Sequence, residues 1–122
     1  MVAVSVFKRK LSGSTDGKPV KVVTVATAGT LVHTAQTGTV DGNYDEIWLY
    51  AFNSDTASRV LTIEFGGPTA PDQNIVQTLD AQSGLVLVVP GLILQNGLTV
   101  KAFASAANVV TISGWVNKIT EA

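Results

Sequence analysis

The fold is decided by Gly84-Leu-Val-Leu-Val-Val-Pro-Gly-Leu-Ile-Leu94, the most apolar stretch of the chain. Its first part, Leu85–Val89, is too short to span a membrane and is rich in β-branched residues, so it predicts a buried strand. Pro90-Gly91 is expected to interrupt that strand, because proline lacks a backbone donor and glycine permits a sharp change of direction. Asn96-Gly97 then separates this stretch from the apolar run Leu98–Phe103, which predicts a hairpin.

Similar patterns lie on both sides of this stretch. Glu46–Phe52 predicts a strong strand with two apolar faces, so one face should meet the core and the other a second layer or another subunit. Its two faces carry Ile47, Leu49 and Ala51 on one side and Trp48, Tyr50 and Phe52 on the other. Further strands are predicted at Val2–Phe7, Val20–Thr27, Thr30–Thr34, Val60–Phe65, Asn74–Leu79 and Val109–Ile119, the last with Trp115 as a core or interface anchor.

Eight or nine short strands without a helical period predict an all-β protein. The expected architecture is an antiparallel β-sandwich, jelly-roll-like, with an extended N-terminal arm. At 122 residues the chain is long enough for one core. We expect a basic arm over residues 1–21 and a single β-sandwich domain over residues 22–122.

Charge is scarce and unevenly distributed. Charged residues make up 14% of the chain, against about 25% in typical domains, which indicates that part of the surface is covered by other protein. Five cations of the arm, opposed there only by Asp16, are candidates for contact with an acidic neighbour: Lys8, Arg9, Lys10, Lys18 and Lys21. Only Phe7 lies among them, so nucleic acid is not expected as a partner.

No catalytic or metal-binding pattern is recognisable. His33 is the only histidine; the spacing supplies neither metal-binding partners nor the oriented aspartate of a triad, so a strand histidine near the surface is expected. Asp41–Glu46 spaces its oxygen atoms like a calcium loop but lacks the loop's glycine, and predicts a turn. Glu64 is expected on an outward face as a solubilising charge. We therefore predict no enzyme, no cofactor and no metal.

Two further classes are excluded by composition. The chain has no cysteine, so it has neither disulfides nor thiolate metal ligands. No window reaches 18 apolar residues, so no transmembrane helix and no membrane partner are expected. The N-terminal residues lack the basic start and long apolar core of a signal peptide, which predicts synthesis in the cytoplasm.

Four stretches carry a family resemblance: Lys10–Val22, Gly29–Thr34, Asp45–Asn53 and Ser83–Leu92. In pattern they resemble small virion proteins of tailed bacteriophages. The resemblance implies a β-sandwich that coats or cements the capsid, often as a trimer at three-fold positions. It implies two partners, the major capsid protein and the chain itself as a homotrimer, and a place on the outer capsid surface after synthesis in the host cytoplasm.

The main functional hypothesis is therefore a capsid decoration protein, or cement protein, which bridges shell subunits without catalysis. Its contacts are expected from the basic arm and from Trp48, Tyr50 and Phe52. The alternative is a tail or fibre component that binds host glycan through residues 41–45 and 66–72. Glycan contact ranks behind protein contact, because aromatic residues on a strand more often serve a core or a subunit interface.

Overall fold

The computed structural model describes residues 3–121, which form nine strands and no helix. Within these residues, accordingly, no helix is long and apolar enough to cross a membrane. The strands are β1 (Val4–Lys10), β2 (Val20–Lys21), β3 (Thr30–Thr34), β4 (Tyr44–Asn53), β5 (Arg59–Phe65), β6 (Asn74–Leu79), β7 (Val86–Leu94), β8 (Thr99–Ala104) and β9 (Val110–Glu121).

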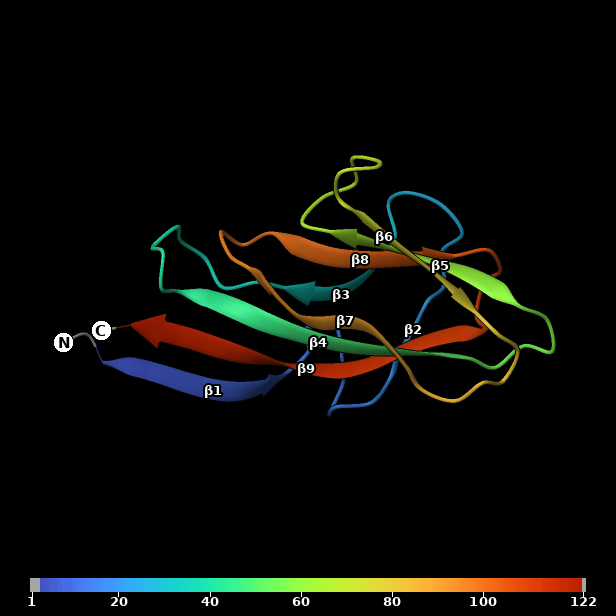
Figure 1. Ribbon diagram of the computed structural model, residues 1–122, viewed down its shortest axis with the longest axis horizontal. Helices are drawn as coiled ribbons and strands as arrows, with labels where there is room; N and C mark the ends of the chain where they lie inside the picture. The colour runs from blue at the N-terminus through green and yellow to red at the C-terminus, as the bar shows by residue number, and fades with distance from the viewer. Residues whose placement is uncertain (1–2, 122) are drawn as a thin grey trace.

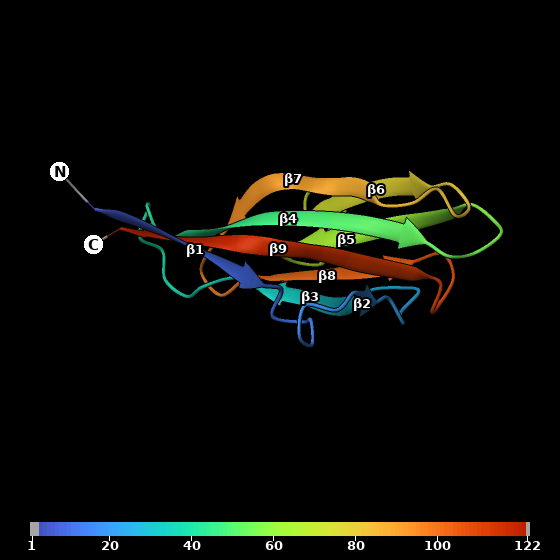
Figure 2. The same cartoon turned by 90° about the horizontal axis from the view of Figure 1, so that it is seen from below.

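Two antiparallel sheets pack face to face, which confirms the predicted all-β sandwich (Figures 1 and 2). The larger sheet has the order β1-β9-β4-β7, with β2 also paired to β9; the smaller has the order β3-β8-β5-β6. From β2 onward every connection except β5–β6 passes from one sheet to the other. This alternation places strands that are consecutive in sequence on opposite sides of the core.

The core lies between the inner faces of β4 and β5. Ile47, Leu49 and Ala51 are fully buried, and Leu61 and Ile63 face them from the smaller sheet. Because successive side chains of a strand point to opposite faces, the outer residues of β4 are only half-buried. The two-faced strand predicted over Glu46–Phe52 is confirmed.

The most apolar stretch does not form a central strand. The strand predicted over Leu85–Val89 exists from Val86 onward, but the prediction that it is buried is wrong for its first part. β7 is an edge strand of the larger sheet, where only Val88 and Val89 are buried and Leu85 is 65% exposed. Pro90-Gly91 does not end the strand either. The strand continues through shifts of register against β4, which accommodate a proline at a sheet edge.

The hairpin predicted at Asn96-Gly97 is also wrong. Both residues have the left-handed backbone that the dipeptide favours, with φ of 65° at each. However, β7 and β8 belong to different sheets. The turn hydrogen-bonds instead to the segment after β3: Asn96 N donates to the Gly38 carbonyl at 2.9 Å and Gly97 N to the Gln36 carbonyl at 3.0 Å. A distant segment thus takes the bonds of the expected hairpin.

The described part of the predicted arm belongs to the sandwich. β1 pairs with β9 over its whole length, from Val4 opposite Glu121 to Lys10 opposite Trp115. Leu11 enters the core. Val2, the start of the predicted first strand, lies outside the described residues. The predicted strand Val20–Thr27 is wrong beyond Lys21, because the chain there leaves the larger sheet and crosses to the smaller one.

Candidate functional site

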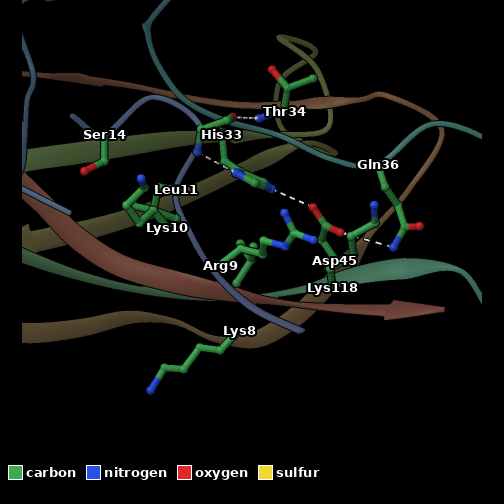
Figure 3. Close-up of a pocket in the computed structure, with 12 residues that line it drawn as sticks. Lys8, Arg9, Lys10, Leu11, Ser14, His33, Thr34, Gln36, Asp45 and Lys118 are labelled. Carbon is green, nitrogen blue, oxygen red and sulfur yellow. Dashed lines mark hydrogen bonds and ion pairs between the residues drawn. The ribbon is translucent and has the colours of Figure 1, made fainter. Parts of the chain in front are cut away.

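An open groove of about 700 Å³ lies between β1 and β3, the edge strands of the two sheets (Figure 3). We call it the basic groove. It is lined by residues 8–12 and Ser14 from β1 and the turn after it, by His33, Thr34 and Gln36 from β3 and the residues after it, and by Asp45, Val116 and Lys118 from β4 and β9.

Strand register explains why cations face this groove. Val116 is buried and faces the core, and Arg9 lies opposite it on β1. Lys118 is two residues further along β9 and so shares that face. The inward side of the larger sheet therefore carries Arg9 and Lys118, in the hollow between the edge strands of the two sheets.

Beneath these cations, His33 and Asp45 form a buried pair between the sheets. His33 Nε2 lies 2.6 Å from Asp45 Oδ2, and both side chains are 5% exposed. The Ser12 backbone N–H donates to His33 Nδ1 at 3.0 Å. Since Nδ1 accepts, the proton of the neutral imidazole is on Nε2, where it is donated to Asp45. The prediction of a histidine near the surface is wrong.

The pair resembles part of a catalytic triad, but its geometry does not suit a general base. A base needs a free ring nitrogen directed at the nucleophile. In this site both nitrogens are used, one by the Asp45 carboxylate and the other by a backbone amide. The Ser12 hydroxyl points elsewhere, since its oxygen accepts the Thr34 N–H at 2.6 Å. We conclude that the pair positions the turn after β1.

The predicted cations divide into two groups. Lys8, Arg9 and Lys10 line the groove. Lys18 and Lys21 lie outside it: the Lys18 backbone N–H donates to the Thr15 carbonyl and closes a turn, and Lys21 lies on β2 opposite Thr111. Lys118 also lines the groove but was not identified from the sequence. It belongs to the acidic part of the sequence after residue 21, and only the pairing of β9 with β1 places it beside the arm.

The cations of the groove have no acidic partner within residues 3–121. The ion pairs there join His33 to Asp45 and Arg59 to Asp55. Lys8 lies over the Trp115 ring, 4.7 Å from its centroid, and Figure 3 shows it extending away from the His33–Asp45 pair. Arg9 extends toward the pair instead.

The outer face of the larger sheet carries a cross-strand stack of aromatic rings. Trp48 and Trp115 are stacked with centroids 6.0 Å apart and planes at 14°, and Tyr50 lies 6.1 Å from Trp115. Gly91 of β7 lies against the other face of Trp48, since a Cβ there would be 2.7 Å from the ring. Neighbouring strands thus cover the ring faces. Phe52 is half-buried on the same strand face, opposite Thr111.

Glu46 orients the edge of this stack. Its Oε1 accepts hydrogen bonds from Trp48 Nε1 at 2.7 Å and from Asn117 Nδ2 at 3.0 Å. These two bonds, the one from Trp48 first, lower the pKa of Glu46 below its ordinary value of 4.5, against an opposing effect of burial. Glu46 therefore stays ionised and fixes the Trp48 ring.

Glu64 is buried on the smaller sheet, so its prediction as an outward solubilising charge is wrong. It is 2% exposed because the segment between β2 and β3 covers it. Gly29 N donates to its Oε1 at 2.6 Å and Thr27 Oγ1 to its Oε2 at 2.9 Å. The carboxylate anchors the crossing segment.

Residues 41–46 do not gather around a common point. Asn43 Oδ1 accepts the Glu121 N–H at 2.8 Å, and Asp45 is engaged by His33. Over residues 3–121 no group of three or more histidine and carboxylate side chains is arranged to hold a metal ion.

Comparison with known proteins gives no relative: no family model, curated protein or solved structure matches the chain.

Proposed function

We propose that this chain is a non-catalytic structural protein of a tailed-bacteriophage virion, a decoration protein that binds the assembled capsid and stabilises it. The observation that carries the proposal is that both edge strands of the larger sheet expose large apolar side chains. On β1 these are Val4, Val6 and Phe7; on β7 they are Leu87, Leu92 and Ile93.

Apolar side chains exposed at sheet edges favour association. An edge strand presents unpaired backbone groups, and soluble monomers protect such edges with charges, bulges or covering loops. β1 carries the cations Lys8–Lys10, and β7 carries Pro90 and two shifts of register, but the apolar side chains of both strands stay exposed despite this protection. Burial of both edges against other protein removes apolar surface from water, and this stabilises the assembly by about 25 cal/mol per Å².

In the proposed role each copy contacts other copies, as a homotrimer, and the major capsid protein on the outer capsid surface. Stable occupancy of such a site requires a junction of about 1,000 Å² or more. A protein that bridges several shell subunits opposes the outward pressure of packaged DNA, since the shell can expand only if these junctions open. No chemistry is required of any side chain.

The test is to mix the purified protein with undecorated phage capsids and to examine them by electron microscopy. We expect additional density at symmetric sites of the shell. Val6→Glu should reduce the occupancy, whereas Val76→Glu should not; both valines are 61% exposed, but Val76 lies on the smaller sheet. Shells without added density, or equal effects of the two substitutions, contradict the proposal.

The alternative, a glycan-binding tail or fibre component, has less support. Sugar rings bind the faces of aromatic side chains, and in this protein Trp48 is covered by Gly91 and Trp115, and Trp115 by Lys8. A glycan array in which the protein binds a polysaccharide would favour this alternative.

A further inference from the structure

We propose that the basic groove is a binding site for the carboxylates of an acidic, extended segment of a partner protein, held by Arg9 and Lys118. The inference rests on the proposed function only in naming the capsid as the source of that segment. The site itself follows from the groove's unpaired cations and from its balance of hydrogen-bond donors and acceptors.

Two acceptors of the groove, the Asp45 carboxylate and the Ser12 oxygen, are already used. Asp45 Oδ2 accepts from His33, and Asp45 Oδ1 accepts from Gln36 Nε2 at 3.2 Å. The Ser12 oxygen accepts the Thr34 N–H. The hydroxyl proton of Ser12 and the charged groups of Arg9 and Lys118 remain as donors without a partner among the described residues. A ligand that pairs with these cations supplies acceptors and negative charge.

The arrangement of these donors favours carboxylates. The guanidinium of arginine forms two parallel hydrogen bonds with a carboxylate, which gives geometry as well as charge. Arg9 and Lys118 lie on adjacent strands of one sheet face, so they can hold carboxylates of one extended segment lying along β1. The free edge of β1 offers backbone donors and acceptors to the same segment.

Nucleic acid fits this groove less well. Bases of single strands bind by stacking on aromatic rings. Phe7 is the ring near the groove, and Arg9 already lies over it at 5.6 Å, while Trp48, Tyr50 and Trp115 face the opposite side of the sheet.

The His33–Asp45 pair positions this site. Asp45 orients Gln36, whose Nε2 also donates to the Ile119 carbonyl at 3.0 Å. His33 holds the backbone of Ser12, the second residue after β1, and so fixes the end of the strand that carries Arg9. His33 and Asp45 thus act as positioning residues of the site.

The probe is an acetylated and amidated peptide of alternating glutamate and valine, seven residues long like β1. Titration calorimetry at low salt compares it with peptides in which glutamine or lysine replaces glutamate. We expect binding of the glutamate peptide alone. Arg9→Gln combined with Lys118→Gln should weaken it about tenfold or more, since each substitution removes a charged hydrogen bond. The matched control, Lys18→Gln with Lys21→Gln, removes two cations outside the groove and should leave the affinity unchanged.

A variant with reversed charges distinguishes loss of the binding site from loss of the fold. Arg9→Glu with Lys118→Glu should bind the lysine peptide in place of the glutamate peptide, a gain that an unfolded variant cannot give. Equal binding of the glutamine and glutamate peptides overturns the proposal, as does an unchanged affinity of the Arg9→Gln, Lys118→Gln variant. Tighter binding of a thymidine octanucleotide, lost in that variant, would assign the groove to nucleic acid instead. Peptide binding without capsid decoration would preserve the site and reject the capsid role.

Discussion

His33 Nε2 lies 2.6 Å from Asp45 Oδ2, and this contact joins the edge strand of one sheet to an inner strand of the other. Because both groups are buried, removal of either partner leaves the other without this hydrogen bond in a site largely shielded from water.

Asp45→Ala should therefore lower the free energy of unfolding by about 1–3 kcal/mol, because it leaves the neutral His33 Nε2–H without an acceptor. The control is Asp55→Ala, which removes the more exposed Asp55–Arg59 pair and should lower the free energy of unfolding much less. Urea denaturation followed by tryptophan fluorescence measures both. Similar losses for the two variants would mean that the buried pair contributes no more than a surface pair.

Gly91→Ala should disturb the aromatic stack. Gly91 has φ of 76°, and an added Cβ would meet the Trp48 ring at 2.7 Å. Gly84 has φ of 85° but open space around it, so Gly84→Ala measures the backbone strain alone, about 1–2 kcal/mol. We expect Gly91→Ala to cost more than Gly84→Ala in thermal unfolding and to change the near-UV circular dichroism of the tryptophans. An unchanged near-UV spectrum would contradict the contact.

Glu64→Ala should release the segment between β2 and β3. The substitution removes the acceptors of the Gly29 N–H and the Thr27 hydroxyl, and the loss of a charged hydrogen bond costs about 1.5–3 kcal/mol. Hydrogen exchange should become faster at Gly29 and its neighbours while β9 stays protected. Equal acceleration in both regions would indicate global destabilisation instead of a local anchor.

Glu46 should make stability depend on pH in the acid range. Its pKa is lowered in the folded protein, so its hydrogen bonds contribute stability above its ordinary pKa of 4.5, and this contribution is lost as pH falls through the lower folded value. Glu46→Gln should thus reduce the stability at pH 7, and the difference from the unsubstituted protein should shrink below pH 4.5. A difference independent of pH would exclude the carboxylate as its source.

Patterns within a single strand correctly predicted features that depend on that strand alone. The alternation of Glu46–Phe52 identified the core face of β4, because burial on one side of a strand gives a period of two. The same argument failed for Leu85–Val89, since an apolar run looks the same in the sequence of a central strand and in that of an edge strand. The Asn96-Gly97 turn has the predicted backbone, yet its hydrogen bonds go to residues 36–38, which no short-range pattern reveals.

The candidate site was predicted only in part. Lys8, Arg9 and Lys10 were recognisable as a run of cations, but Lys118 joins them only through the pairing of β1 with β9. His33 and Asp45 are 12 residues apart on different sheets, and neither has a neighbour in sequence that signals the contact. The resemblance to phage virion proteins remains a prediction.

The row formed by Gly91, Trp48, Trp115 and Lys8 crosses the larger sheet at right angles to its strands. A force that pulls β1 and β7 apart within the plane of the sheet acts along this row. A force in that direction otherwise breaks the backbone hydrogen bonds between neighbouring strands one after another. The contacts of this row link all four strands in addition to their backbone hydrogen bonds, so the sheet should resist lateral separation of its strands more strongly than the backbone hydrogen bonds alone would allow.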